Sequence, residues 1–411
     1  MAVRSLLLDI SPLRENRAFR NLFIARTILL FGVGSVLVTV PLDVYAMTGS
    51  TGPVSLVAAV EGLAFFVGFL SGGVLADRSD RKTLIIRSWL VCGASFAGLA
   101  LNAAFVGALW PVFLFVATNG VSGAMGITAL LAVLPSLVGR SKLHAVGALN
   151  TLSLRLGTVL APTLGGVIVS VADAQWSYAL GGLAALGSSP LLRGLPSDPG
   201  GGGDAGEGPL RSLVSAYRFV ARQQVVLGVM VAGVVGMIGG GSLVLAPAFV
   251  DARFGGEPAV VGLMYSAISV GLVVGALVSG WLTTTTRPGL VLLLMMIVCF
   301  ACYAAAGAAP AVLLVLVFLV GAGMANSMEE VLRYALLQLH TPDAMLGRVN
   351  SAFAAQNMSG AAVGALVAGA FATWFGPGEV FWIYNAVMAA VSVMVLVLLR
   401  TLRRTGAAPP Q

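Results

Sequence analysis

Residues 53–82 read PVSLVAAVEGLAFFVGFLSGGVLADRSDRK, an apolar run followed by a charged turn. Between Pro53 and Ala76 the only ionisable side chain is Glu61. An α-helix crosses the hydrocarbon core of a bilayer with about 20 mostly apolar residues, so this run is long enough to span a membrane. The stretch therefore predicts a transmembrane helix that ends at a basic loop.

The same pattern repeats along the whole chain. Hydrophobic residues make up 58% of the 411 residues, charged residues make up 9%, and the mean hydropathy is +0.97. A soluble domain carries about 25% charged residues, so the composition excludes a soluble enzyme. The apolar segments begin near Ala18, Pro53, Leu84, Pro111, Leu143, Trp176, Val225, Ala259, Pro288, Val312, Asn350 and Val380. We therefore predict an all-α membrane protein with twelve transmembrane helices.

The basic residues predict the orientation of these helices. Of the 23 Lys and Arg residues, only Arg253 falls in an expected external loop, and Arg26, Arg155 and Arg333 fall within expected helices. The other nineteen lie at expected cytoplasmic loops and ends, as the positive-inside rule requires. We expect a cytoplasmic-membrane protein with both termini in the cytoplasm. Because contact with the bilayer accounts for the net charge of +7, we expect no nucleic-acid partner.

A Gly- and Pro-rich segment near the middle divides the chain. We predict an N-terminal six-helix half over 1–193, a cytoplasmic linker over 194–224, a C-terminal six-helix half over 225–400 and a cytoplasmic tail over 401–411. Residues 210–222 have one apolar and one basic face, which is typical of an interfacial helix; an extension of the next transmembrane helix is the alternative. An offset of 207 positions pairs Gly68 with Gly275 and Gly73 with Gly280, which indicates two parallel repeats related by pseudo-two-fold symmetry.

The charged turn after the second predicted helix is a candidate cytoplasmic latch. It consists of Gly73, Asp77, Arg78, Arg81 and Lys82. Basic side chains at such a turn can pair with carboxylates and with the last carbonyl groups of a helix, and so hold two groups of helices in one conformation. The alternative is that these charges serve only the positive-inside rule.

Two motifs carry a family resemblance. The pattern Gly73-x-x-x-Asp77-Arg-x-x-Arg-Lys82 resembles the signature of the major facilitator superfamily, with Asp80 at a position that is usually Gly. Gly157-Thr-Val-Leu-Ala161-Pro162-Thr-Leu-Gly165-Gly166 resembles the Gly-rich motif of its proton-driven antiporters, with Ala161 where Gly is usual; ordinary small-residue packing is the alternative. The antiporters' Arg on the fourth helix is missing, because Val116 stands three residues before Asn119. The resemblance implies the major facilitator fold.

Further segments resemble siderophore exporters of this superfamily, and macrolide-efflux members share much of the pattern. They are Asn16–Arg26, Leu130–Arg140, Arg155–Gly157, Thr285–Leu290, Thr341–Arg348 and Ala355–Asn357. The resemblance implies a monomeric secondary exporter of a catecholate (enterobactin-like) siderophore, driven by a proton gradient and without a cofactor. Multidrug or macrolide efflux is the alternative. A channel is an alternative of another class, although two halves with charges inside the helices favour alternating access.

Ionisable groups within the expected helices are candidates for proton coupling, because such groups are costly in a membrane. They are Glu61, Glu329 and Glu330. Glu329 and Glu330 stand four and three residues before Arg333, so either carboxylate can pair with it. A purely structural ion pair is the alternative for these two. Glu61 lies about eight residues inside its helix, and exposure to water at the nearby helix end is the alternative reading.

The candidate substrate-binding residues combine cations with polar and aromatic groups. They are Arg26, Asn119, Arg155, Arg333, Tyr334 and Asn357. The three arginines would attract acidic hydroxyl groups, and Tyr334 could stack on a ring together with Phe65, Phe66 and Trp382, although aromatic residues in a bundle more often serve packing. Cys299 and Cys302 have the spacing of metal ligands, but without a second pair we expect neither a metal site nor a catalytic site.

Overall fold

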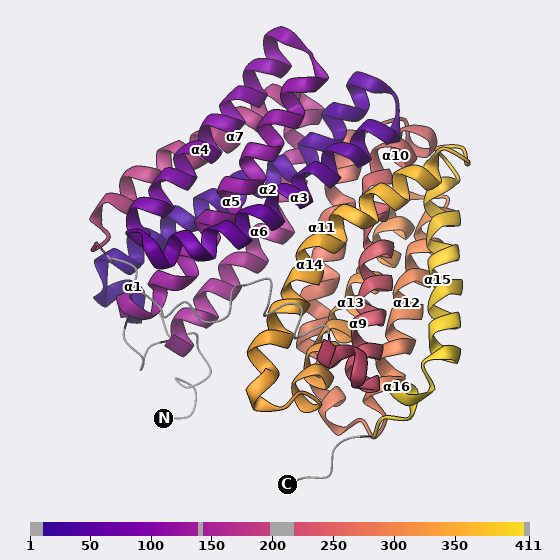
Figure 1. Ribbon diagram of the computed structural model, residues 1–411. Coiled ribbons are helices and arrows are strands. Elements are labelled where there is room, and N and C mark those ends of the chain that lie inside the picture. The colour runs from indigo at the N-terminus through magenta and orange to yellow at the C-terminus, as the bar shows by residue number, and fades with distance from the viewer. Residues whose placement is uncertain (1–10, 139–142, 198–217, 407–411) are drawn as a thin grey trace, which may run out of the picture. The chain divides into compact units, whose positions relative to one another are not determined.

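The computed structural model describes residues 11–138, 143–197 and 218–406, and every regular element in these ranges is a helix (Figure 1). The chain forms two compact units. Unit 1 contains Met1–Met47 and Leu63–Asp204, and unit 2 contains Thr48–Gly62 and Ala205–Gln411. The Gly-rich part of the predicted linker, and the predicted interfacial helix up to residue 217, lie outside the described residues.

Unit 1 is built from long helices (Figure 1). Its elements are α1 (Ser11–Glu15), α2 (Arg17–Thr48) as far as Met47, α3 (Thr51–Arg78) from Leu63 onward, α4 (Arg81–Leu101), the π-helical turn η1 (Asn102–Val106), α5 (Leu109–Val138), α6 (Leu143–Ala172), α7 (Ala174–Ser188) and η3 (Ser189–Gly194). Helix α4 packs against both α5 and α7. Phe19, Ile85 and Trp89 lie in one buried apolar cluster, which joins α2 to α4.

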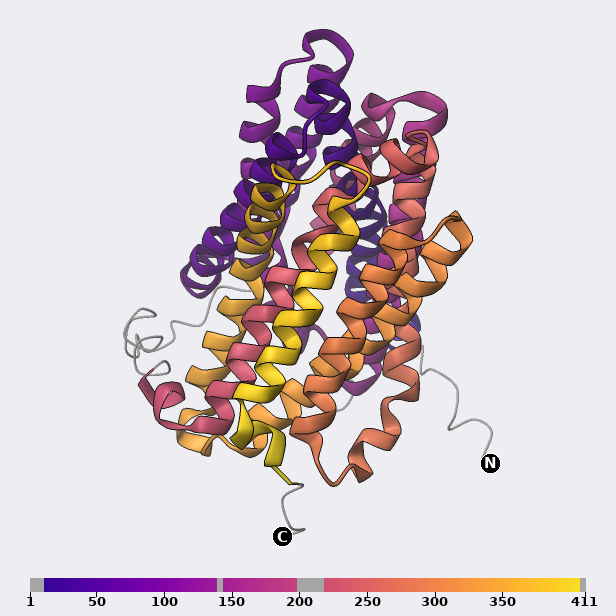
Figure 2. The ribbon, with the colours of Figure 1, turned by 90° about the vertical axis from the view of Figure 1, so that its right-hand side faces the viewer.

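Unit 2 contains the remaining helices and the first part of α3, as far as Gly62. After a short helix at 218–222 its elements are α9 (Gln224–Gly240), η4 (Gly241–Leu245), α10 (Ala246–Phe254), α11 (Pro258–Val278), η5 (Ser279–Thr284), α12 (Pro288–Ala308), α13 (Val312–Leu339), α14 (Asp343–Ala372), α15 (Val380–Leu398) and α16 (Arg400–Arg404). Helix α13 packs against α11 and α12, and α14 packs against α9. Figure 2 shows α15, in yellow, beside α9 and α12.

The long helices lie where the sequence predicts them. Each begins within three residues of its predicted start, except α14, which begins at Asp343 instead of near Asn350. Hydropathy marks the apolar part of a helix, and the first turns of α14 contain Asp343, Arg348 and Asn350, so this helix begins earlier than its apolar segment. Within the described residues, ten helices are long and apolar enough to cross a membrane; α7, with 15 residues, and α14 are not among them.

The predicted division at the linker assigns all of α3 to the first half, whereas in the structure α3 is shared. Its first residues contact α14 of unit 2: a Cβ built on Gly62 would lie 2.8 Å from the Cβ of Ala362. A Cβ on Gly369 would likewise overlap the side chain of Ser55. Small residues therefore allow α3 and α14 to approach closely.

Glycines also bring helices into backbone contact at equivalent places in each unit. A Cβ on Gly68 would overlap the backbone of Val121 on α5. One on Gly275 would lie 2.6 Å from the carbonyl oxygen of Met324 on α13. Because the 207-residue offset relates these two glycines, the internal repeat in the sequence corresponds to a repeated close approach of helices.

Large apolar side chains also cover exposed helix faces. Leu183, Leu277 and Leu313 are 70%, 78% and 72% exposed. Extended apolar surface of this kind is typical of contact with a membrane. The exposed faces therefore agree with helices that cross a bilayer.

Candidate functional site

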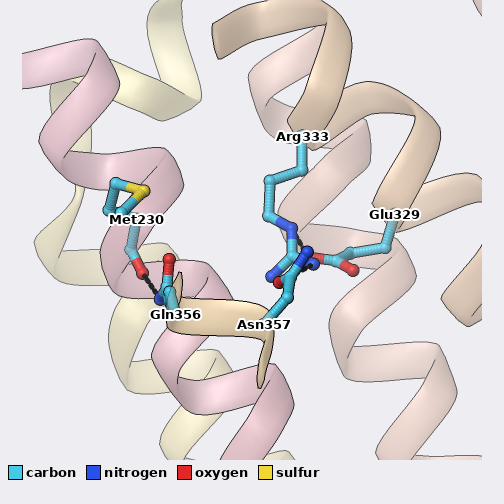
Figure 3. A network of polar contacts seen from close by, with 5 residues as sticks. All are labelled: Met230, Glu329, Arg333, Gln356 and Asn357. Atoms are coloured by element: carbon cyan, nitrogen blue, oxygen red, sulfur yellow. Dashed lines mark hydrogen bonds and ion pairs between the residues drawn. The ribbon is translucent and has the colours of Figure 1, made fainter. Parts of the chain in front are cut away.

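A buried ion pair lies on α13 (Figure 3). Glu329 and Arg333 are one helical turn apart, so their side chains lie on the same face. The Nε atom of Arg333 is 3.7 Å from Oε1 of Glu329, and the two side chains are 8% and 7% exposed. At this distance no hydrogen bond forms, and neither atom has a hydrogen-bond partner among the described residues. The pair is thus held by charge alone and retains donor and acceptor capacity.

Helix α14 supplies the next contacts of Arg333. Its Nη2 donates a long hydrogen bond of 3.5 Å to Oδ1 of Asn357. Its Cζ lies 5.0 Å from the centre of the Phe353 ring, within the range of a cation–π interaction. Asn357 and Phe353 are one turn apart on α14, so a single face of this helix holds the guanidinium group. Figure 3 shows Asn357 and Glu329 both directed toward Arg333.

Helix α9 completes this cluster. Gln356, which is 8% exposed, donates from Nε2 to the carbonyl oxygen of Met230 at 2.7 Å. A Cβ on Gly233 would lie 2.5 Å from Nη1 of Arg333 and 3.0 Å from Nε2 of Gln356. The absence of a side chain at Gly233 therefore provides the space for both groups. We call Gly233, Glu329, Arg333, Phe353, Gln356 and Asn357 the polar cluster of unit 2.

The other carboxylates predicted for proton coupling lie outside this cluster. Glu330 is exposed, so of the two carboxylates that could reach Arg333 it is Glu329 that pairs. Glu61 is half-buried on α3, where it interacts electrostatically with Tyr265 of α11. The Tyr265 hydroxyl donates a hydrogen bond of 3.4 Å to the carbonyl oxygen of Leu243. Unit 2 therefore holds two separate acidic positions at membrane depth.

Two polar residues predicted to bind substrate, Tyr334 and Asn119, lie in different units of the structure. Tyr334 is 52% exposed, and its ring centre lies 6.4 Å from that of Phe353, so it borders the polar cluster. Asn119 lies on α5 in unit 1, where its Oδ1 accepts a hydrogen bond of 2.9 Å from the thiol of Cys92. The side-chain oxygen of Asn119 is thus engaged within unit 1.

The two in-helix arginines of unit 1 lie on α2 and α6, and a side-chain hydrogen bond joins these two helices. The hydroxyls of Thr27 and Ser153 form a hydrogen bond of 2.7 Å between these helices, next to Arg26 and two residues before Arg155. Nη1 of Arg26 is buried and has no hydrogen-bond partner among the described residues. Arg155 is half-buried. Unit 1 thus contains a buried guanidinium nitrogen that can bind an acceptor.

The antiporter-like motif forms the remainder of this contact with α2. A Cβ on Gly34 of α2 would lie 2.6 Å from that of Ala161, and a Cβ on Gly165 would overlap the carbonyl oxygen of Ser35. A Cβ on Gly157 would lie 3.2 Å from the Cβ of Leu30 on α2, which is closer than an ordinary van der Waals contact. The other motif residues, Pro162 and Gly166, are buried on the same helix. Small residues of the motif therefore serve close packing of α6 on α2.

In the candidate latch, basic side chains bind backbone carbonyl groups of other helices. Nη1 of Arg81 donates to the carbonyl oxygen of Ala132 on α5 at 3.2 Å, and Nζ of Lys82 donates to that of Arg193 at 2.8 Å. Asp80 caps α4 by accepting from the backbone N–H of Thr83 at 3.0 Å, which explains an acidic residue where the family usually has Gly. The other latch residues are Gly73, which has open space around it, exposed Arg78, and Asp77, whose side chain lies outside the described part of the structure.

Long apolar helices that bury charged and amide side chains are typical of a multi-pass membrane transport protein. The sequence model of one protein family, the Major Facilitator Superfamily, matches this chain twice, over residues 22–354 and over residues 229–411. The chain therefore belongs to this superfamily. It is 37% identical to the enterobactin exporter EntS of Citrobacter koseri over 99% of this chain and 98% of the relative. It is also 37% identical to the enterobactin exporter EntS of Shigella boydii serotype 18, over 100% of this chain and 99% of the relative.

Solved structures show the same fold. The nucleoside transporter NupG has a TM-score of 0.76 at 14% identity, over 94% of this chain and 99% of the other. A bacterial homologue of the iron transporter ferroportin, in an inward-facing state, has a TM-score of 0.68 at 17% identity, over 95% and 99% of the two chains. At these identities the similarity shows the fold alone.

Proposed function

We propose that this transporter exports a catecholate siderophore of the enterobactin type across the cytoplasmic membrane. The observation that carries the proposal is the 37% identity to enterobactin exporters over nearly the full length of both chains. The positive-inside distribution of Lys and Arg supports a cytoplasmic location of both termini. We propose that the working form is a monomer.

The buried arginines support an acidic, hydroxyl-rich cargo. Arg26 in unit 1 and Arg333 in unit 2 each have a guanidinium nitrogen without a hydrogen-bond partner among the described residues. An unsatisfied cation at membrane depth is costly. The phenolic oxygens of a catecholate would accept hydrogen bonds from these groups and offset that cost.

We further propose that export is coupled to inward movement of protons through Glu329. Its Oε1 is buried and has no hydrogen-bond partner among the described residues, so it can accept a hydrogen bond from a cargo hydroxyl or take up a proton. These two events compete for one oxygen. On the cytoplasmic side the ionised carboxylate, balanced by Arg333, binds cargo. On the external side a proton takes its place, and cargo leaves.

The competition favours exchange, because a protonated Glu329 accepts a hydrogen bond from a cargo hydroxyl more weakly than the ionised carboxylate does. The cytoplasm-facing conformation then favours cargo at Glu329, and the outward-facing conformation favours a proton. A coupled transporter needs this difference in binding between its two conformations. Glu61 and Glu330 remain candidates for passing the proton to or from Glu329. The Asp77 latch remains a proposed control on the change between conformations.

Secretion by living cells tests the proposed cargo. The chain is expressed in a bacterium that makes enterobactin but lacks its own exporter, and enterobactin is measured in the medium and in the cells. We expect most of the siderophore to appear in the medium, and Arg333→Gln to reduce secretion at least tenfold with unchanged membrane insertion. Cells that retain the siderophore while gaining resistance to a macrolide would show that the cargo is a drug.

A further inference from the structure

The side chain of Gln356 has a fixed orientation. A backbone carbonyl group can only accept, so the hydrogen bond to Met230 requires that the amide nitrogen faces α9 and that Oε1 faces away from Met230. Figure 3 shows the two atoms in this arrangement. No donor among the described residues reaches this oxygen, although the side chain is only 8% exposed. Because a buried acceptor without a donor is costly, Oε1 indicates a donor on a ligand.

Arg333 presents donors close to this acceptor. A Cβ built on Gly233 would lie 2.5 Å from Nη1 of Arg333 and 3.3 Å from Oε1 of Gln356, so these two atoms are at most about 5.8 Å apart. No hydrogen bond joins the two side chains in the described structure, since Oε1 has no partner. A hydroxyl oxygen makes hydrogen bonds of about 2.8 Å on either side. One hydroxyl can therefore donate to Oε1 and accept from the guanidinium group.

We propose that Gln356 and Arg333 form a subsite that recognises a free phenolic hydroxyl of the cargo and so selects the iron-free siderophore. This inference rests on the proposed function. An ether oxygen accepts but cannot donate, and catechol oxygens that coordinate Fe³⁺ have lost their protons. Both kinds of ligand leave Oε1 of Gln356 unsatisfied. A site with such an acceptor discriminates against the ligand that lacks the donor.

Three neighbouring residues hold the side chains of Gln356 and Arg333 in position. Met230 fixes the amide of Gln356, and Phe353 lies against the guanidinium group of Arg333 at 5.0 Å. Gly233 leaves room for both side chains. The subsite is therefore built by α9, α13 and α14 together, and it adjoins Glu329, where cargo and proton are proposed to compete.

Binding by the purified full-length chain in detergent tests the subsite. The probes are 2,3-dihydroxybenzoyl-serine and its two mono-O-methyl ethers, with dissociation constants measured by calorimetry. We expect the wild type to bind the catechol about three- to tenfold more tightly than the weaker ether, which is the effect of one hydrogen bond. In Gln356→Met this ratio should fall to about one. Gln338→Met is the matched control, because Gln338 is likewise a glutamine that joins two helices, α13 and α14, by a 3.0 Å bond to Asn350, and it should keep the wild-type ratio.

A second variant covers the case in which Gln356→Met does not fold. Gly233→Ala places a methyl group in the space between Arg333 and Gln356 and should also bring the ratio to about one. If either folded variant keeps the wild-type ratio, or if the wild type binds catechol and ethers equally, the subsite is refuted while the cargo class stands. If the wild type binds neither the catechol nor the ethers, the proposed cargo fails and the subsite fails with it.

Discussion

Replacing Arg333 by Met tests how strongly unit 2 depends on its buried ion pair. The charged atoms are 3.7 Å apart, and both side chains are less than one-tenth exposed. At an effective dielectric constant of about 20, two unit charges at this distance attract by about 4.5 kcal/mol, and breaking a buried pair costs about 3–5 kcal/mol. We expect Arg333→Met to lower the free energy of unfolding by about 3 kcal/mol, because Glu329 is left without its counter-charge.

The reverse replacement and the double variant complete the cycle. Glu329→Gln should cost about 1–2 kcal/mol, since Arg333 keeps Asn357 and the ring of Phe353. The double variant Glu329→Gln/Arg333→Met buries no charge, and its stability should return to within about 1 kcal/mol of the wild type. The coupling energy should therefore be about 3–5 kcal/mol.

Unfolding of the purified protein in mixed micelles by a denaturing detergent, followed by circular dichroism, gives these free energies. Arg400→Met is the control, because Arg400 is exposed and its replacement should change stability by less than about 0.5 kcal/mol. If the double variant loses as much stability as the two single variants together, the charges are not coupled. The interpretation of the polar cluster as an ion pair would then be wrong.

Two further predictions concern unit 1. Asp77→Asn should reduce transport several-fold with normal folding and insertion, because it removes a charge from the latch with little change in volume; wild-type transport would assign this loop to the positive-inside rule alone. Gly165→Ala should lower the free energy of unfolding by about 1–3 kcal/mol, because its Cβ overlaps the carbonyl oxygen of Ser35. Gly147→Ala on the same helix has no atom within 4 Å of its Cβ and should keep the stability or raise it by up to about 1 kcal/mol, because Ala favours a helix more than Gly does. Equal thermal stabilities of the two variants would refute the packing argument.

The positions of the long helices could be predicted from the sequence because the membrane imposes a simple rule. A transmembrane helix must carry an apolar segment of nearly fixed length, and the hydropathy of the sequence shows directly where such a segment lies. The rule does not report polar residues that extend a helix into water, so the start of α14 at Asp343 was missed. It also gives no information on which helices share a packing unit, as α3 illustrates at Gly62.

The candidate site was predictable only where contacts are local. Spacing of four residues along one helix pairs Glu329 with Arg333, and the structure selects this pair over Glu330 because the latter is exposed. Gln356 and Gly233 were missed, since their contacts join residues that are a hundred or more positions apart in sequence. An adjacent pair of amide residues, Gln356 and Asn357, inside the apolar segment predicted from Asn350 onward was the signal that could have found Gln356.

Transport by reconstituted vesicles measures the central claim, the exchange of a catecholate for protons at Glu329. Vesicles with the cytoplasmic face outward are given an acidic interior, and uptake of enterobactin is followed. We expect the wild type to concentrate enterobactin inside until a protonophore is added, and Glu329→Gln to exchange it downhill without concentrating it. If a variant with Gln at Glu61, Glu329 and Glu330 still concentrates enterobactin against its gradient, proton coupling through these carboxylates is contradicted.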